Sequence, residues 1–392
     1  MLLIIQSILV YGFMIWVMTY FGVVAYKAQY PQGYGAVNRL GNKKVNYLAI
    51  LSKSYFLIPI LVFCFFAAIR YRVGVDCETY KEIFYDINHY GISLVAQNIE
   101  VGYVYLSKLT YSVTGSHYLL FFILAFLQIV FYYIALQKER HALIFLGIAI
   151  MLTGHYWSLM NGMRQNVAAC AFVAMIPFVI NNKWLYFVAG VMLATTMHRS
   201  ASLLLPIGVL AYFLRNGILN KYMQLAILAL SYLCMNKFDN VFSENIMSFA
   251  VDSGYEDSEV STYTEHEATT YKFGLRMYLL YLVYCLVILF SDKMYRFFKS
   301  KSFNTMYNLF FIAICLTLIF YNNFTVKRLI YYFTCFTPVI VSYFMFYLWK
   351  TKKRELLFFT IIILLVQVIW SVHSDITQKG PFEPMLYKFD FN

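Results

Sequence analysis

The sequence predicts an all-α, polytopic integral membrane protein, and three observations support this prediction. Of its 392 residues, 61% are hydrophobic and only 13% are charged, whereas a soluble domain carries about 25% charged residues. Residues 117–136 contain no Lys, Arg, Asp or Glu, and about 20 apolar residues form a helix long enough to cross a bilayer. Similar apolar runs recur along the chain, so we expect a single membrane domain over residues 1–392.

The apolar runs predict about twelve transmembrane helices. The first is expected to be retained, because it lacks the positively charged region that precedes the apolar core of a signal peptide. The runs between residues 142 and 214 are short, so some of these spans are expected to be split or re-entrant. In chain order the expected spans are 2–24, 47–69, 117–136, 142–158, 164–181, 184–198, 200–214, 222–235, 273–290, 305–321, 329–349 and 355–372.

Two longer connections, 70–116 and 236–272, are expected to be outer loops that face the substrate. With the N-terminus outside, alternating spans place 18 of the 31 Lys and Arg residues in the cytoplasm and 16 of the 19 acidic residues outside. This distribution follows the positive-inside tendency and puts both termini outside the cytoplasm. It also accounts for most of the net charge of +12. We therefore expect no nucleic acid as a partner, since such proteins gather basic residues on one surface.

Six arginines remain on the outer side, each at or near the end of an expected span. Arginine binds phosphate and carboxylate through a planar fork of donors, whereas lysine acts as a point charge. These positions predict an anion-binding site, although an arginine at a membrane interface can also reach lipid headgroups. The six are Arg70, Arg72, Arg164, Arg199, Arg276 and Arg328.

The stretch 69–84, "IRYRVGVDCETYKEIF", places acidic residues shortly after Arg70 and Arg72. Gly74 permits a tight turn above the membrane, which would fold the acidic residues back toward the two arginines. Asp76 is then either a catalytic carboxylate or a local ion-pair partner. Glu100 precedes a second glycine and an aromatic residue, where an acid at a helix N-terminus is also an ordinary finding.

Arg164 and Gln165 stand before the apolar run 167–180. This run of 14 residues spans about 21 Å as a helix, less than the hydrocarbon core. We expect either local thinning of the bilayer or a recessed helix mouth in which Arg164 lines a polar cavity, and charges at that depth usually mark a functional site. The alternative is an arginine that contacts lipid phosphate.

The stretch 197–206, "MHRSASLLLP", brings His198, Arg199 and Ser200 to the same outer side as Arg164. The His198 side chain is suited to proton transfer near neutral pH, although a single interfacial histidine is often a bystander. Arg328 follows Lys327 at the outer start of another expected span, in "NNFTVKRLIYYF".

No cofactor and no metal are expected. The seven cysteines show no metal-ligand spacing, and no nucleotide-binding, zinc-protease or serine-hydrolase motif is present. Loop 236–272 holds eight acidic residues, but their spacing matches no calcium motif. Metal binding, gating and recognition of a hydroxyl-rich ligand remain alternatives to an ordinary solvated loop.

In their order and spacing, these short motifs resemble the EpsG-like branch of the Wzy-type bacterial polysaccharide polymerases. The family often has Thr-Asp-Tyr after the glycine of the first motif, where this chain has Val75-Asp76-Cys77. The residues that carry the resemblance are Arg70, Gly74, Val75, Asp76, Tyr80, Glu100, Gly102, Arg164, Gln165, His198, Arg199, Ser200, Ala201 and Arg328.

The resemblance implies a GT-C-like glycosyltransferase that acts at the outer face of the bacterial cytoplasmic membrane. Such enzymes polymerise O-antigen, capsule or exopolysaccharide repeat units carried on undecaprenyl diphosphate. The growing chain moves from its lipid carrier to a hydroxyl of the next lipid-linked unit. The implied partners are undecaprenyl-diphosphate-linked oligosaccharides and membrane lipids, together with a chain-length regulator and a flippase.

The residues suit this chemistry. A departing diphosphate needs cations, and we expect Arg70, Arg164 and Arg328 to bind it, with Arg72 and Arg199 as second choices. The attacking hydroxyl needs a base, for which Asp76, Glu100 and His198 are the candidates. Tyr80, Gln165 and Ser200 are expected to contact substrate. A lipid-linked-glycan flippase, an O-antigen ligase and, more remotely, a membrane acyltransferase are the alternative functions.

Overall fold

The structure is a computed structural model that describes residues 2–34, 52–90, 99–237, 273–377 and 385–390. Within these ranges every regular element is a helix, and one isolated antiparallel bridge joins Arg70 to Phe389. This confirms the predicted all-α architecture. Loop 236–272 lies outside the described residues except at its first two positions.

Six helical stretches in the described part are long and apolar enough to cross a membrane. A further pair, bent by 56° at its junction, makes a seventh if it is one span. The prediction of a polytopic membrane protein is thereby confirmed. The six are α1 (Leu2–Gln29), α7 (His117–Leu136), α10 (Met163–Ile180), α18 (Lys301–Ile319), residues 326–350 of α19 (Phe324–Thr334) and α20 (Thr337–Lys350), and α21 (Arg354–Thr377); the bent pair is α16 (Leu275–Leu289) with α17 (Ser291–Phe298).

Shorter helices occupy the other positions where spans are expected. The expected span 142–158 is split at Thr153 and Gly154, where the left-handed backbone of Gly154 (φ 80°) ends one helix and begins the next. The shorter elements are α3 (Ser54–Ala68), η1 (Arg140–Ala142), α8 (Leu143–Leu152), α9 (His155–Met160), α11 (Trp184–Met197), η2 (Arg199–Leu203), α12 (Leu204–Phe213), η3 (Leu214–Asn216) and α13 (Lys221–Leu233).

The helices form a bundle whose outer surface is apolar. Only 28% of the apolar stretch of α1 and of α21 is buried inside the protein, against 78% for residues 326–350. Large apolar side chains such as Trp16, Phe358 and Trp370 are exposed. A soluble protein rarely exposes so much contiguous apolar surface, so this surface is suited to contact lipid. Inside the bundle, α10 packs against α7 and α11, and α20 packs against α8.

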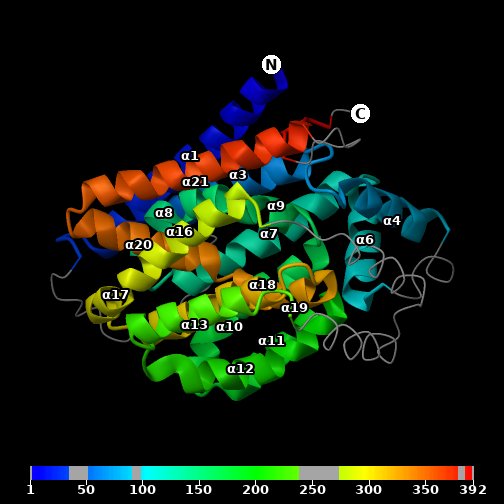
Figure 1. Cartoon of the computed structure of the whole chain (residues 1–392). Coiled ribbons are helices and arrows are strands. Elements are labelled where there is room, and N and C mark those ends of the chain that lie inside the picture. Colours follow the sequence, from blue (N-terminus) through cyan, green and yellow to red (C-terminus); the bar gives the residue numbers. More distant parts are fainter. Residues whose placement is uncertain (1, 35–51, 91–98, 238–272, 378–384, 391–392) are drawn as a thin grey trace.

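Two ends of the bundle can be distinguished in Figure 1, where α4 (Cys77–His89) and α6 (Val101–Thr114) lie at the right and α17 lies at the left. The end with α4 and α6 also carries the segment 385–390, in which Asp390 pairs with Lys81 of α4 and the Tyr387 N–H donates to Ser7 Oγ of α1 at 2.8 Å. We call it the site end. At the opposite end the Arg140 N–H donates to Gln29 Oε1 at 2.9 Å, and Ser300 contacts Glu139.

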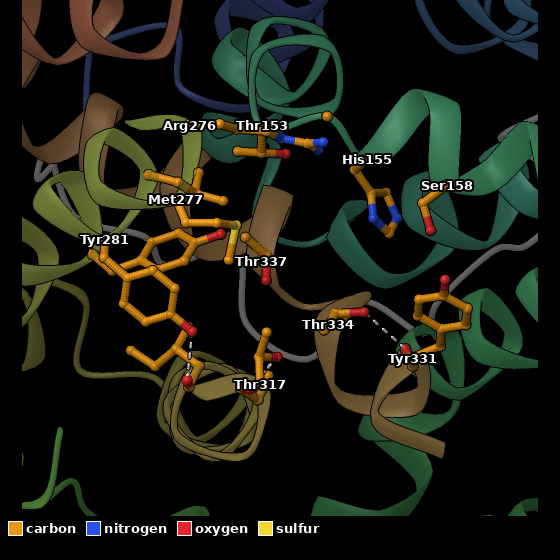
Figure 2. A pocket seen from close by; sticks show the side chains of 15 residues that line it. Thr153, His155, Ser158, Arg276, Met277, Tyr281, Thr317, Tyr331, Thr334 and Thr337 are labelled. Carbon is orange, nitrogen blue, oxygen red and sulfur yellow. Dashed lines mark hydrogen bonds between the residues drawn. The ribbon is translucent and has the colours of Figure 1, made fainter. Parts of the chain in front are cut away.

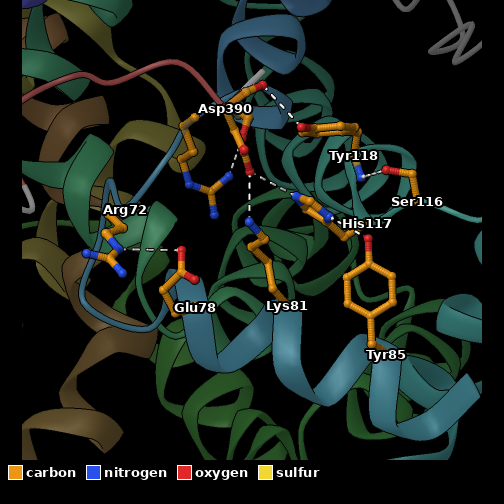
Figure 3. Close-up of polar contacts among 10 residues, drawn as sticks. Arg72, Glu78, Lys81, Tyr85, Ser116, His117, Tyr118 and Asp390 are labelled. Atoms are coloured by element: carbon orange, nitrogen blue, oxygen red, sulfur yellow. Dashed lines mark hydrogen bonds and ion pairs between the residues drawn. The ribbon is translucent and has the colours of Figure 1, made fainter. Parts of the chain in front are cut away.

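The segment 385–390 fastens α4 to the bundle (Figure 3). Asp390 is 4% exposed, and its Oδ2 accepts a hydrogen bond from Lys81 Nζ at 2.9 Å and lies 3.3 Å from His117 Nε2. Tyr118 donates through its hydroxyl to the Asp390 carbonyl at 3.1 Å, and Tyr85 contacts His117. The pKa of Lys81 is raised, because the bond and the charge of Asp390 outweigh the lowering by burial. The insertion 70–116 is thus anchored on the bundle.

Candidate functional site

Glu100 lies at the centre of a polar cluster at the site end. It precedes α6, is 6% exposed, and forms an ion pair through Oε2 with Arg164 Nη1. Its Oε1 lies 2.9 Å from His198 Nδ1 and accepts the Arg199 backbone N–H at 3.1 Å. The structure therefore brings together four predicted site residues from three separate parts of the chain.

Close packing of α6 against α11 brings Glu100 to His198. A Cβ at Gly102 would lie 2.6 Å from Thr196 Oγ1 and 2.7 Å from the Thr196 carbonyl oxygen, closer than real contacts allow. Thr196 stands two residues before His198 in the chain. Glycine at position 102 is therefore required for this approach.

Replacing Gly102 by Ala is expected to destabilise the protein by about 1–3 kcal/mol, because the added methyl group pushes α6 away from α11. Thermal unfolding in detergent measures this effect. Gly12→Ala is the matched control, since a Cβ at Gly12 would meet nothing within 4 Å. Equal unfolding temperatures for the two variants would contradict the packing explanation.

Arg164 is held between the acid and two tyrosines. Its guanidinium carbon lies 5.4 Å from the ring centre of Tyr103 and 6.0 Å from that of Tyr80, within range of cation–π attraction. The Arg164 backbone N–H donates to the Tyr80 hydroxyl at 3.4 Å. Within the described part of the chain, the buried Arg164 Nε and Tyr103 hydroxyl have no hydrogen-bond partner. These groups remain available to a ligand.

The loop after Arg72 positions the start of α10. Asp76 Oδ2 accepts the Gly162 N–H at 2.9 Å, and the Asp76 N–H donates to Asn161 Oδ1 at 2.9 Å. Gly74 has φ 86°, and a Cβ there would lie 2.9 Å from the Met160 carbonyl oxygen, so the turn requires glycine. The predicted tight turn at Gly74 is confirmed, and the Asp76 carboxylate bonds to backbone rather than to either arginine.

Arg70 and Arg72 have different environments. Arg70 is fully buried, and its donors contact the carbonyls of residues 67, 73 and 160 and the sulfur of Met163. Arg72 lies partly exposed, with Nε 3.9 Å from Glu78 Oε1 (Figure 3). The expectation that the acidic stretch folds back toward these arginines is confirmed for Glu78. Arg70 sits below the site surface and supports the turn between α9 and α10.

Two further predicted residues join α10 and η2 to α19. Gln165 donates through Nε2 to the Arg328 carbonyl at 2.5 Å, and Ser200 Oγ lies 2.9 Å from the Tyr332 hydroxyl. Gln165 is buried, whereas the Arg328 side chain is half-buried. Gln165 directly follows Arg164 in the chain, so this bond places the Arg328 backbone at the edge of the Glu100 cluster, which we define as Glu100, Arg164, His198 and Arg199.

The Glu100 carboxyl is held in its ionised form. Burial alone raises its pKa, but the hydrogen bond with His198 and the charge of Arg164 lower the pKa to about 2. Because this value lies below that of an exposed glutamate, ionised Glu100 stabilises the folded state above about pH 4.3, by about 3 kcal/mol. This contribution is lost as the pH falls from about 4.3 through 2.

Replacing Glu100 by Gln is expected to flatten the acid side of the stability profile. Wild-type protein should lose more of its thermal stability between pH 6 and pH 3 than the variant, because only the wild type must protonate this paired carboxylate. Exposed Glu82 offers the control Glu82→Gln. A Glu100→Gln profile that parallels the wild type would mean that the carboxylate is not paired in the folded protein.

Some residues of this region escape sequence reasoning. Asn166 donates to the carbonyls of Ser158 at 2.7 Å and Asn161 at 2.8 Å, and so holds the turn between α9 and α10. Its only sequence signal is a polar residue inside an apolar helix. The sequence marks Tyr103 only as an aromatic residue after Gly102, and this does not predict its contact with Arg164.

Arg276, another of the six outer arginines, lies outside the Glu100 cluster and lines a cavity of about 260 Å³ (Figure 2). The cavity lies between α9, α16, α18, α19 and the start of α20. Its polar lining consists of Thr153, His155, Ser158, Arg276, Tyr281, Tyr284, Thr317, Tyr331, Thr334 and Thr337.

Among the described residues, no group of three or more His, Cys, Asp or Glu side chains is arranged to hold a metal ion. Most of the acidic loop 236–272 lies outside these residues. The seven cysteines are free thiols, five of them buried within the helices.

The chain was compared with protein families, curated proteins and solved structures. No curated protein and no solved structure matches the chain. The EpsG family matches residues 53–384, a region that contains α3 to α21 and every residue of the Glu100 cluster. Members of this family are similar to Wzy-type polymerases. Because the match covers most of its length, the chain belongs to the EpsG family.

Proposed function

We propose that the protein is a Wzy-type, GT-C-like glycosyltransferase that polymerises oligosaccharide repeat units carried on undecaprenyl diphosphate. The EpsG family suggests a polymerase-like membrane protein of polysaccharide biosynthesis. The site residues supply the rest of the proposal, since they combine a cation for the departing diphosphate with a base for the attacking hydroxyl.

One observation carries the proposal: the Glu100 carboxylate contacts the Arg164 guanidinium and the His198 imidazole together. A carboxylate only accepts hydrogen bonds, so the contact with His198 requires a proton on Nδ1. Neutral His198 then has an unprotonated Nε2. This is the arrangement by which an acid orients a histidine base in other enzymes.

Of the three candidate bases, His198 fits best. Glu100 is paired with Arg164 and has a pKa lowered to about 2, which makes it a poor proton acceptor at neutral pH. The Asp76 carboxylate accepts a backbone hydrogen bond from Gly162. We therefore assign His198 Nε2 as the base and Glu100 as the residue that positions it.

In the proposed step, His198 Nε2 takes the proton of the acceptor hydroxyl while the oxygen attacks the anomeric carbon of the donor sugar. The bond between that carbon and the diphosphate oxygen breaks, and its electron pair stays with the diphosphate. Arg164 stabilises the developing negative charge. We assign supporting roles to Arg199, whose backbone N–H donates to Glu100, and to Arg328, whose carbonyl accepts from Gln165. Such preorganised donors act more strongly in a water-poor site than in water.

The other predicted binding residues take supporting roles in this proposal. The guanidinium of Arg70 donates to backbone carbonyls, so Arg70 positions the turn that precedes Arg164. Arg72 lies near Glu78 at the margin of the site, where it can contact the second phosphate of the diphosphate. Tyr80, Gln165 and Ser200 hold Arg164, Arg328 and Tyr332 in place, so they shape the site around the substrate.

We further propose that the site end faces the outside of the bacterial cytoplasmic membrane, with about twelve membrane passages. The opposite end gathers the connections near residues 29, 138–141 and 300, which are rich in Lys and Arg and fit the positive-inside tendency. A chain-length regulator and a flippase would be the partners of such an enzyme.

Purified protein in proteoliposomes, given a lipid-linked repeat unit, is expected to release undecaprenyl diphosphate and make a ladder of longer glycans. The products are separated by gel electrophoresis and identified by mass spectrometry. The double variant Arg164→Ala/His198→Gln is the negative control. Translocation without longer glycans would identify a flippase, and transfer only to a different acceptor would identify a ligase; either result overturns the proposal.

A further inference from the structure

The cavity at Arg276 lies outside the Glu100 cluster and has the character of a binding site. Pockets for drug-sized ligands measure about 300–1,000 Å³, so its volume of about 260 Å³ suits a smaller ligand, close to one sugar ring. Five threonine or serine hydroxyls and three tyrosines line it besides residues 155 and 276. Figure 2 shows these polar groups gathered around a common space.

Arg276 is oriented by its surroundings and still reachable. When the Gln367 amide nitrogen donates to the Leu152 carbonyl at 2.9 Å, the Gln367 oxygen accepts from Arg276 Nε at 3.1 Å. A Cβ at Gly154 would lie 3.2 Å from Arg276 Nη2, so glycine leaves room for the guanidinium. Arg276 is exposed, whereas Leu280, one turn further along α16, is buried.

No carboxylate among the described residues lies within ion-pair distance of Arg276. Asp375 acts on its charge only from farther away, and the Asp375 carboxylate accepts the Met385 N–H at 3.1 Å. The terminal nitrogens of Arg276 can therefore form a two-point contact with one incoming carboxylate. A diphosphate carries more charge than this single cation would balance.

The hydroxyl groups favour a sugar as the carrier of that carboxylate. The hydroxyls of Thr153, Tyr281, Thr317 and Thr334 already donate to backbone carbonyls. Their oxygens can therefore accept hydrogen bonds from the hydroxyl groups of a sugar ring. Tyr281 and Tyr331 add aromatic surface. In Figure 2, Ser158 and Tyr331 lie at the right of the cavity, Tyr281 lies at the left, and Arg276 lies at the top between them.

Two hydrogen bonds connect α10, which carries Arg164, to elements that line the cavity. Ser158, which lines it, accepts through its carbonyl from Asn166 on α10. Tyr331 and Thr334 come from α19, whose Arg328 carbonyl accepts from Gln165. Helix α10 therefore contacts both the Glu100 cluster and the helices that line the cavity.

We propose that the cavity binds one anionic sugar residue of the glycan, a uronic acid, with its carboxylate on Arg276 and its hydroxyls on the threonine and tyrosine lining. This inference rests on the proposed function, because it assumes that a glycan occupies the site end. It adds a substrate class: repeat units that contain an acidic sugar.

The test uses full-length protein in a detergent without a sugar headgroup, with methyl β-D-glucuronide and methyl β-D-glucoside as probes. Saturation-transfer NMR measures their binding, and acetate is the competitor. We expect the glucuronide to bind at least about 10-fold more tightly than the glucoside, because its carboxylate adds a hydrogen-bonded charge pair with Arg276. Arg276→Gln should abolish this preference, and Thr334→Val should weaken both sugars.

Arg296→Gln is the matched control, because Arg296 lies on α17 at the opposite end, where its Nε contacts the Asp292 carbonyl at 3.3 Å. It should bind like the wild type. The inference is overturned if the wild type shows no preference for the glucuronide, if Arg276→Gln keeps the preference, or if acetate binds as tightly as the glucuronide.

Binding of farnesyl diphosphate separates this inference from the proposed function. Its binding should depend on Arg164 and remain unchanged in Arg276→Gln. Farnesyl diphosphate binding without glucuronide binding would overturn the sugar site alone. Glucuronide binding through Arg276 without diphosphate binding would overturn the diphosphate assignment and leave the sugar site in place.

Discussion

Replacement of Arg164 by Ala is expected to slow glycan chain growth by about 10²–10³-fold, the effect of removing one preorganised donor from a developing negative charge. Arg164 pairs with Glu100 and keeps its buried Nε free of protein partners within the described residues. The loss should appear mainly in kcat, because the charge on the departing diphosphate grows as the bond breaks. The rate of polymer formation in proteoliposomes measures it.

Arg164→Lys separates charge from geometry. A lysine keeps the cation but lacks the fork of donors, so we expect activity between those of the wild type and the Ala variant. Arg215→Ala, far from the Glu100 cluster, serves as the matched control for removal of an arginine. If both Arg164 variants insert normally into the membrane and make polymer at the wild-type rate, Arg164 has no part in the reaction.

Replacement of His198 by Gln is expected to lower the rate by about 10²–10⁴-fold, the usual contribution of a general base. The glutamine amide can still donate to Glu100, so the cluster should keep its structure while losing the group that accepts the proton. Unfolding temperature and farnesyl diphosphate binding should therefore stay near their wild-type values. Initial rates at saturating donor measure the catalytic effect.

His89→Gln is the matched control for this change. His89 also belongs to the insertion 70–116, and its Nε2 lies 3.2 Å from the Tyr111 hydroxyl on an exposed surface. The control should polymerise at the wild-type rate. A His198→Gln enzyme as fast as the control would return the role of base to Asp76 or to Glu100.

The sequence was sufficient to predict the membrane fold and the central residues of the candidate site. Arg164, Glu100 and His198 could be recognised because charged or titratable groups are costly at the mouths of apolar helices and stand out against their neighbours. Their convergence on one carboxylate could only be proposed from the sequence. The structure shows the contacts, and whether they act on a lipid-linked glycan stays a prediction.

Other features depend on contacts that no local pattern encodes. The burial of Arg70 could not be predicted, because its partners are carbonyls of residues 67, 73 and 160, and any residue type supplies a carbonyl. The expected span 200–214 is divided into η2 and α12, because hydropathy reports apolar content and not where a helix changes its hydrogen-bonding pattern. The cavity at Arg276 is lined by three separate stretches of the chain, 153–158, 276–284 and 313–337.

The bond between Lys81 and Asp390 joins residues that are 309 positions apart. At about 5–20 residues per second, translation needs about 15–60 s to travel from one to the other. During that interval the earlier helices are already being inserted into the bilayer. The helix α4, which begins at Cys77, still lacks the ion pair between Lys81 and Asp390. A ribosome that stalls between the two positions would leave the earlier helices in the membrane without this bond.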